Sequence, residues 1–329
     1  MRRLACLALI GAASSLGAVT EIRSTASLAA PLENQGVDAR SLGMGSALMG
    51  LAPEASAQLW NPAGLSRMKL AEASLHHPSW VADIFQETLT AALPTAGWGT
   101  FGLSAGYAGF GTFERRDATG QLSGSFDARR FGGSLAWSRE WMGSLALGAA
   151  IKMYRQDMGD AGMSGYSGDL GAILRPLAGL SVGLSYANLG ATDAGAALAS
   201  GGRLGLAWEQ VLTSSASLLL AVGTLLEPGG VSKVNVGVEG AIQGRYYARG
   251  GYAAKLVDNQ LNGLQGLSLG LGAVLESLRL DYAWQPYGEL GASHRVSLSY
   301  LFEGGSAAAQ VAPSGKAKAK MKAKVGTKR

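Results

Sequence analysis

The chain has 329 residues, of which 47% are hydrophobic and 16% are charged, and it contains 49 glycines and one cysteine. A charged fraction below the roughly 25% typical of soluble domains, with glycine at about twice its usual frequency, argues against an ordinary soluble globule. A mean hydropathy of +0.15 argues against a disordered chain. The single thiol, Cys6, excludes an intrachain disulfide framework and a thiolate-based zinc site.

The formal net charge of +5 is distributed unevenly along the chain. Seven basic residues and no acidic one lie between Lys316 and Arg329, and residues 31–315 carry 18 basic and 22 acidic side chains. The central region is therefore slightly acidic. A nucleic-acid partner is not predicted, because no basic patch is available outside the tail.

Residues 1–30 have the pattern of a secretory signal peptide. Arg2 and Arg3 precede an uncharged run from Leu4 to Thr20, and small residues suitable for cleavage end at Ala30. The run is too short and too rich in alanine to be a convincing membrane span, although an N-terminal anchor is the alternative. The sequence therefore predicts export.

Residues 31–68 show no alternation of polar and apolar side chains. Asp38 is placed to cap a short helix, and the Asn61-Pro62 pair interrupts the chain, because a residue that precedes proline avoids helical geometry. A segment of this kind in front of a closed barrel has two places to go, the periplasm or the lumen.

The region from residue 69 to 303 repeats a period of two. In Arg295–Phe302, for example, the apolar residues Val296, Leu298, Tyr300 and Phe302 alternate with Arg295, Ser297 and Ser299. This period predicts β-strands of roughly 8–14 residues, which matches the about 9–11 residues that a tilted strand needs to cross a bilayer. About fourteen strands are expected, at 70–77, 85–94, 99–109, 125–138, 143–154, 165–175, 179–188, 202–210, 214–225, 231–241, 244–253, 265–275, 278–286 and 293–302.

The links between these strands alternate in length. Even-numbered strands are followed by short links such as 94–97, whereas most odd-numbered strands are followed by longer polar ones, including 110–124, 189–201 and 254–264. Short turns at one end and long loops at the other are typical of a transmembrane antiparallel β-barrel of the outer membrane, with both termini in the periplasm. The fold class is therefore all-β.

The two faces of the expected strands differ in chemistry. One face carries large apolar side chains, and the other carries Gly, Ala and Ser with scattered charges, which we expect to point into the lumen: Lys152, Arg203, Lys233, Glu239, Arg279, Asp281 and Arg295, together with Asp169, Glu209 and Arg249. Closure in lipid satisfies the strand edges. The alternative, a soluble sandwich, would have shorter strands and no alternation in link length.

Aromatic residues concentrate near the expected strand ends, where a bilayer has its interfaces. We expect an anchoring role for Trp98, Trp141, Tyr154, Trp208, Trp284, Tyr300 and Phe302. After the last strand, residues 304–329 form a Lys- and Ala-rich stretch with nothing to bury, which predicts a disordered tail. A tether to an anionic surface is the alternative for this tail.

The chain offers no convincing catalytic or metal site. The pattern Gly102–Gly106 fits G-x-S-x-G, but it lies inside an expected strand with no helix after it. The three histidines are His76, His77 and His294, and the first two point to opposite faces of a strand, so they do not form a cluster of ligands. We predict no enzyme, no cofactor and no metal.

Two stretches resemble a known family. Gly36–Ala47 with Ala55–Leu65, and Leu280–Gly291 with Ser293–Leu298, resemble the ends of PorV/PorQ-like proteins within the FadL-like outer-membrane barrels. The resemblance implies fourteen strands, and it implies that Asn61, Pro62, Ala63 and Gly64 belong to a plug or hatch motif in the lumen. It also implies that Tyr300 and Phe302 form the terminal signal read by the barrel-insertion machinery. The chain departs from the family at Pro53-Glu54 and in its Lys-rich tail.

Two functions follow from this resemblance. The first is a partner-binding component of protein secretion or cell-surface assembly, in which the long loops dock secreted cargo or a secretion-system protein. The alternative is a FadL-like transporter of hydrophobic small molecules such as long-chain fatty acids, with a pocket between plug and wall and a lateral gap beside the Gly-rich third strand. A purely structural porin remains a third reading. Outer-membrane lipid is a partner in all three.

Overall fold

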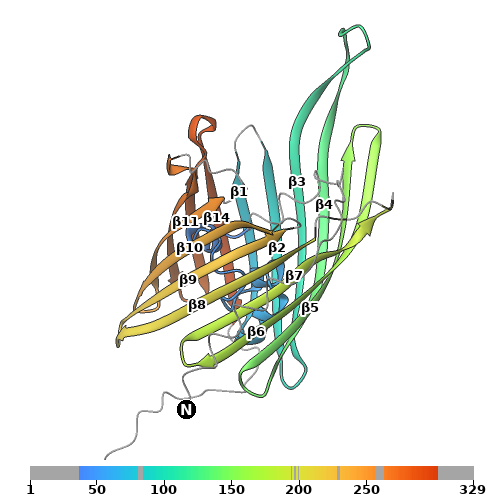
Figure 1. Ribbon diagram of the computed structural model, residues 1–329. Coiled ribbons are helices and arrows are strands. Elements are labelled where there is room, and N and C mark those ends of the chain that lie inside the picture. The colour runs from blue at the N-terminus through green and yellow to red at the C-terminus, as the bar shows by residue number, and fades with distance from the viewer. Residues whose placement is uncertain are drawn as a thin grey trace, which may run out of the picture.

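The computed structural model describes residues 37–80, 84–193, 195, 198, 200–227, 230–255 and 263–302. These residues form a closed barrel in which every strand pairs with its sequence neighbours, and β1 pairs with β14 (Figure 1). The expected count of fourteen antiparallel strands is confirmed. The strands are β1 (Ala71–Ser79), β2 (Phe85–Thr95), β3 (Gly99–Arg116), β4 (Leu122–Trp141), β5 (Leu145–Met158), β6 (Ala161–Leu177), β7 (Leu180–Thr192), β8 (Gly201–Thr213), β9 (Ala216–Glu227), β10 (Gly230–Ile242), β11 (Tyr246–Lys255), β12 (Leu267–Leu275), β13 (Leu278–Pro286) and β14 (Ala292–Phe302).

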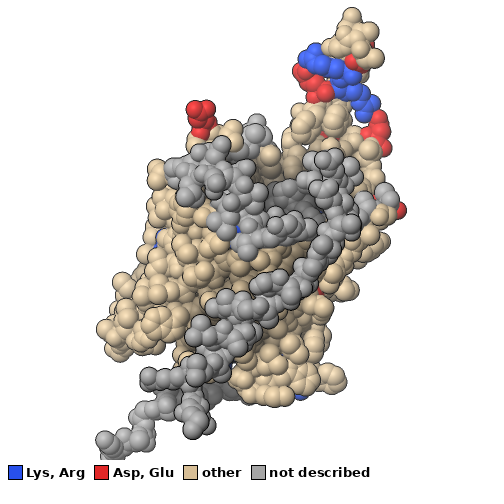
Figure 2. Space-filling view, in the orientation of Figure 1, with Lys and Arg blue, Asp and Glu red and all other residues tan. Residues whose placement is uncertain are grey.

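The barrel is apolar outside and polar or small inside. On β5 the buried, inward positions include Lys152 and small residues. Leu147, Ile151 and Met153 of the same strand point outward and are 41%, 64% and 61% exposed. Water would not stabilise such a surface, but lipid does, because hydrocarbon is the natural partner of large aliphatic side chains. Figure 2 shows few charged residues on the part of the wall that is visible, and most of them lie on the tall hairpin and on a second, smaller projection.

The two ends of the barrel differ in their links. Short turns such as 142–144 and 276–277 join the strands at one end, which we call the turn end, and the opposite end is called the outer end. At the outer end several strands run further than the sequence predicts. The stretch 110–124, expected as a loop, is mostly strand, and only residues 117–121 form the turn between β3 and β4 (Figure 1).

This β3–β4 hairpin extends because its polar sequence still pairs in register. Phe113 stacks on Phe126 with ring centroids 5.6 Å apart, and the Thr112 hydroxyl donates to Asp127. The Asp117 side chain closes the turn by accepting hydrogen bonds from the backbone N–H groups of Thr119 and Gln121. Above the apolar band both faces of a hairpin are hydrated, so charge does not oppose strand pairing there.

Residues 37–68, which we call the inner segment, lie inside the barrel (Figure 1). They contain the helix α1 (Ala39–Gly43) and the 3₁₀ helices η4 (Ala55–Leu59) and η5 (Pro62–Arg67). Two further 3₁₀ turns, η6 (Gly263–Gly266) and η7 (Gly288–Leu290), lie in links at the outer end. No helix among the described residues combines the length and the apolar character needed to cross a membrane. The predicted signal peptide and the Lys-rich tail lie outside the described residues.

Candidate functional site

The inner segment is shaped by its own side-chain caps. The Asp38 carboxylate accepts a hydrogen bond from the backbone N–H of Ser41 at 2.6 Å and so starts α1. The side-chain oxygen Oδ1 of Asn61 accepts a hydrogen bond from the backbone N–H of Ala63 and caps η5, whose first residue is Pro62. The Asn61 amide also donates to backbone carbonyls of two wall strands, Ala172 on β6 and Leu184 on β7. The Asn-Pro pair therefore both begins a helix and ties it to the wall.

The remaining residues of the expected hatch motif are in close contact with their surroundings. A Cβ atom at Gly64 would overlap the Gly50 carbonyl oxygen, and Ala63 lies directly against Gly148 of β5. All four motif residues are buried. The structure therefore places Asn61, Pro62, Ala63 and Gly64 in packing contacts between the inner segment and the barrel wall.

Glycines of the wall make room for the inner segment. A Cβ atom at Gly148 would lie 2.5 Å from the Pro62 carbonyl carbon, and one at Gly251 of β11 would lie 2.7 Å from the Cα of Gly45. The same close approach of the inner segment occurs at inward glycines of seven further strands: Gly102, Gly171, Gly183, Gly205, Gly223, Gly237 and Gly270. We call these nine residues the glycine girdle. At Gly148, Gly237, Gly251 and Gly270 the nearest atom of the inner segment belongs to its backbone, and at the other five glycines it belongs to a side chain. Close approach of two backbones is a role that only glycine fills without displacement.

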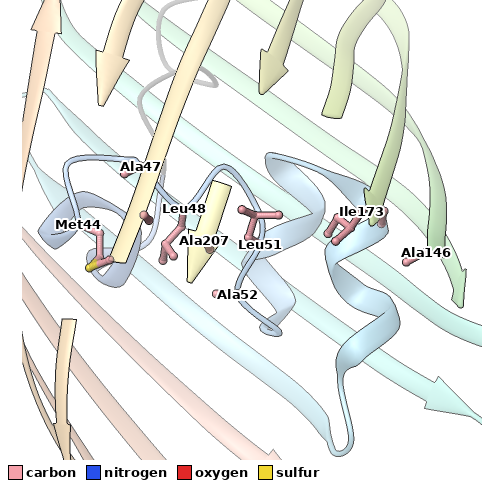
Figure 3. Close-up of a cluster of buried hydrophobic side chains, with 10 residues drawn as sticks. Met44, Ala47, Leu48, Leu51, Ala52, Ala146, Ile173 and Ala207 are labelled. Carbon is pink, nitrogen blue, oxygen red and sulfur yellow. The ribbon is translucent and has the colours of Figure 1, made fainter. Parts of the chain in front are cut away.

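Apolar contacts fill the space between these backbone contacts. Met44, Leu48 and Leu51 of the inner segment pack with Ile173 of β6 and with wall alanines on β5, β8 and β9 (Figure 3). Met44 and Leu48 are essentially inaccessible. The lumen at this level is therefore a packed core.

An ion-pair network joins the inner segment to the opposite part of the wall. Arg40 of α1 makes a two-pronged contact with Glu239 of β10, at 2.8 and 2.6 Å. Glu54 lies 3.2 Å from Arg279 of β13 and 3.7 Å from Arg40. Arg249 of β11 continues the network by contacting Glu239 at 2.5 Å, so that two wall strands and the inner segment share the same carboxylate.

The network closes at Asp281, which contacts both Arg249 and Arg279, and it branches to Glu72. Arg249 contacts Asp281 of β13 at 2.6 Å, and Arg279 contacts Glu72 of β1 at 2.8 Å. All side chains in this network are at least 85% buried, so each charge depends on its partners for stabilisation. Burial raises the pKa of the Glu54 carboxyl to about 7, although Arg40 and Arg279 favour its ionised form.

The other cations expected in the lumen have different surroundings. The Lys152 ammonium lies 2.6 Å from Asp169 of β6, and the Arg203 guanidinium donates to the backbone carbonyls of Leu59 and Trp60. Arg295 is fully buried with its guanidinium 4.7 Å from the Trp80 ring centroid, and Lys233 is half-buried on β10. Arg203 thus holds the inner segment through neutral carbonyls.

Sequence reasoning missed several residues of the site. Arg40 lies in the recognised N-terminal stretch and Glu54 lies where the chain departs from the family, but no pattern shows that they contact β10 and β13. Arg130 and Glu72 were not singled out, although strand alternation places both on inward positions. Tyr154, expected at an interface, is buried in the lumen, where its ring centroid lies 5.0 Å from the Arg130 guanidinium. The alternation of β5 explains this, because Tyr154 shares the face of Lys152.

The exposed aromatic residues at the end of β14 lie where the sequence places them on the outer face. Tyr300 and Phe302 are 46% and 45% exposed, and their ring centroids are 4.8 Å apart. Both face away from the lumen at the turn end, next to β1. Their role as an insertion signal stays a prediction.

The histidines and the G-x-S-x-G pattern do not assemble a reactive site. His76 is buried between Ser297 and Thr90, His77 pairs with Glu87 on the outer face, and His294 contacts Tyr282. The Gly102–Gly106 stretch is paired strand within β3. Within the described part of the chain, no three His, Cys, Asp or Glu side chains are grouped to hold a metal ion.

Two cavities flank the inner segment. One, of about 90 Å³, lies between Leu59 and the inward faces of β2 to β5, and we call it the upper cavity. The other, of about 630 Å³, is ringed by turn-end residues such as Arg175 and Gly244 and has Leu48 and Leu51 at its floor; we call it the vestibule. From Gly99 to Gly109, β3 pairs residue by residue with β2, and from Thr100 to Gly109 with β4, so no lateral gap opens along this described stretch; a register shift follows between Gly109 and Thr112.

Among the comparisons with known proteins, the one with solved structures gives matches. No family model matches the chain, and no curated protein matches it. The toluene transporter TodX of Pseudomonas putida matches 81% of this chain over 98% of its own length, with a TM-score of 0.58 and 12% identity. A FadL homologue of Pseudomonas aeruginosa covers 82% and 99%, with a TM-score of 0.52 and 13% identity.

A third structure gives the same result. The toluene transporter TbuX of Ralstonia pickettii matches 82% of this chain over 99% of its own length, with a TM-score of 0.52 and 11% identity. At such identities the likeness concerns the path of the backbone and leaves the ligand open. The fold of this chain is that of the FadL-like outer-membrane β-barrels.

Proposed function

We propose that this chain is an outer-membrane transporter of hydrophobic small molecules. The observation that carries the proposal is the combination of a lipid-facing wall with a lumen that the inner segment divides into two cavities. A purely structural barrel needs no such internal partition. Solved barrels of the same fold include proteins described as toluene transporters, which supports a transport role.

In this proposal the inner segment acts as the plug. Its contacts with the glycine girdle and with the ion-pair network surround it, and a ligand that moves from the upper cavity to the vestibule must pass it. We place the turn end in the periplasm, because short turns face that compartment in barrels of this type. This orientation puts Phe302 on the periplasmic side.

The secretion-partner reading has less support. It rests on the resemblance of two sequence stretches to PorV/PorQ-like proteins, whereas the structural matches include transporters. The β3–β4 hairpin is the element that would contact cargo in that reading, since it extends beyond its neighbours (Figure 1). Cargo binding would leave the internal partition without a role.

Uptake by cells tests the proposal. A strain that lacks the protein is compared with the same strain complemented by the wild type, using labelled toluene, short- and long-chain fatty acids, and glucose as a hydrophilic control. We expect uptake of at least one hydrophobic compound to fall severalfold without the protein and to recover on complementation, while glucose uptake stays unchanged. Unchanged uptake together with a stoichiometric protein companion in native mass spectrometry would favour the secretion-partner function.

Conductance tests the plug. Removal of residues 37–65, with the signal sequence kept, is expected to leave an inserted barrel that conducts ions in a planar bilayer. The wild type should show little current under the same conditions. Inserted barrels that remain non-conducting after the deletion would show that this segment does not block the lumen.

A further inference from the structure

The ion-pair network between the inner segment and the wall holds unequal numbers of positive and negative groups. Every member contacts at least one other member at 3.7 Å or less, and each side chain is at least 85% buried. With all groups ionised, three cations face four anions, so the network carries a net charge of −1. The members are Arg40, Arg249 and Arg279 with Glu54, Glu72, Glu239 and Asp281.

The charged and titratable groups beside the network do not cancel this excess. Asp38 of the inner segment and Arg295 of β14 attract each other and add one charge of each sign. His76 of β1 is buried, and its two ring nitrogens lie 2.9 and 3.0 Å from the hydroxyls of Ser297 and Thr90. A neutral imidazole satisfies both contacts, because one nitrogen donates and the other accepts. One negative charge of the network therefore stays in excess.

Glu54 is the carboxyl group of the network that is best placed to bind a proton. Its contacts with Arg40 and Arg279 are both made by Oε2, so a proton on Oε1 leaves both contacts in place. Burial disfavours the charged form and raises the pKa of Glu54 to about 7, and the nearby carboxylates of Asp38 and Glu72 act in the same direction. The excess negative charge of the network is therefore neutralised most readily at Glu54.

The network borders the vestibule, from which protons and water reach it. Arg40 and Glu239 line this cavity, together with Pro53, which precedes Glu54 in the chain. Pro53 is exposed, whereas Glu54 itself is only 3% exposed. A displacement of the inner segment that breaks the contacts of Glu54 would transfer its carboxyl group from the protein interior to water.

We propose that the ion-pair network is a one-proton latch: with one proton bound it holds the inner segment in the lumen, and loss of this proton loosens the segment from β10 and β13. The sign follows from the two environments of Glu54, because its pKa is about 7 in the seated segment and an ordinary 4.5 in water. Displacement therefore releases a proton and is favoured as the pH rises. The equilibrium between seated and displaced forms should change by up to about tenfold per pH unit within this window.

Hydrogen exchange measured by mass spectrometry on the full-length protein in lipid nanodiscs tests the latch. The readout is the protection factor of the backbone amides of α1, which corrects for the intrinsic effect of pH on exchange. We expect this protection to fall by at most about 30-fold between pH 5 and pH 7, and by only about twofold more up to pH 8. Equal protection of α1 from pH 5 to pH 8 in the wild type would overturn the proposal.

Substitutions of carboxylates sharpen the test. Glu54→Gln has no titratable group at this position and should keep α1 equally protected at every pH, whereas Glu54→Asp should retain a pH dependence. Glu72→Gln removes the excess negative charge, so the fall in protection should end at a lower pH. Glu276→Gln is the matched control, because Glu276 is exposed in the turn between β12 and β13. A Glu54→Gln variant with the heat-modifiable folded band and the wild-type pH dependence would refute the latch.

Ion conductance in planar bilayers separates the latch from the proposed plug role of the inner segment, on which it rests. Protection and current that both depend on pH in the wild type, and on neither count in Glu54→Gln, would support the latch and the plug together. Protection that depends on pH without any change in current would support the latch and count against the plug. Protection that is independent of pH would reject the latch and leave the plug to the deletion of residues 37–65.

Discussion

The inner segment meets the barrel wall in two different ways. Toward β10 and β13 the contact includes ion pairs, which Arg40 makes with Glu239 and Glu54 makes with Arg279. Toward β5 to β9 the contact is steric, through the glycine girdle and apolar side chains, and the girdle continues beside the ion pairs at Gly237, Gly251 and Gly270. An ion pair selects a charged partner, whereas a steric contact excludes larger side chains. The inner segment is therefore seated by shape on both sides and oriented by charge on one of them.

The largest effect is expected on the ionic side. Arg249→Met leaves Glu239 and Asp281 buried with one partner fewer, and we expect it to lower the free energy of unfolding by about 3–5 kcal/mol. Thermal denaturation followed by heat-modifiability on gels measures the change. Arg155→Met is the control, because its ion pair with Asp157 is exposed and contributes about 0–1 kcal/mol. If both substitutions lowered the free energy of unfolding equally, the buried ion pairs of Arg249 would contribute no more to stability than the exposed pair of Arg155.

A smaller loss is expected on the steric side. Gly148→Ala adds a Cβ atom 2.5 Å from the Pro62 carbonyl carbon, and the overlap should cost about 1–3 kcal/mol. Gly240→Ala is the matched control, because a Cβ atom there would meet nothing within 4 Å. If both alanine variants melt like the wild type, the glycine girdle is not a constraint on the seating of the inner segment.

The ionic side should also depend on pH. The pKa of Glu54 is raised from its ordinary 4.5 to about 7, so the folded state binds the proton more tightly than the unfolded chain does. The stabilisation of the folded state by protonated Glu54 is therefore fully present below about pH 4.5 and is lost as the pH rises through 7. The stability of the wild type relative to Glu54→Gln should fall across this window by at most about 1.4 kcal/mol per pH unit. A difference that stays constant from pH 4 to 8 would contradict this assignment.

The smallest effect is expected from a single neutral hydrogen bond. The Ser185 hydroxyl donates to the Trp60 carbonyl, which also accepts from Arg203 at 2.7 Å. Because the carbonyl keeps its second donor, Ser185→Ala should cost only about 0.5–1 kcal/mol, without pH dependence. If Ser185→Ala lowered the free energy of unfolding more than Gly148→Ala does, polar contacts and not shape would hold the inner segment against β5 to β9.

Much of the barrel could be predicted from the sequence, because a strand in lipid must bury its backbone polarity and expose apolar side chains at every second position. The alternation around Leu147, Ile151 and Met153 is an example. Strand ends were harder to predict. Residues 110–116 carry charge and were expected to form a loop, although a hydrated hairpin tolerates such residues. The residue type of Tyr154 predicts a place at the interface, whereas its position in the alternation predicts an inward side chain.

The lumen was less predictable than the wall. Asp38 and the Asn61-Pro62 pair are local signals, and their helix-starting roles follow from neighbouring residues. Arg40 pairs with Glu239, and Glu54 pairs with Arg279. More than 180 residues of sequence separate the two members of each pair, so no local pattern identifies these partners. The nine girdle glycines also look like the other glycines of the chain until the inner segment is in place.

The sequence by itself determined the all-β class, the number of strands and the face of each strand that meets lipid, because a period of two is a local property enforced by the bilayer. The tertiary structure alone decided which charges pair across the lumen, which glycines touch the inner segment and where the cavities remain. Those contacts depend on closure of the barrel, which brings β1 beside β14 and places residues 37–68 against residues that follow them by up to 258 positions.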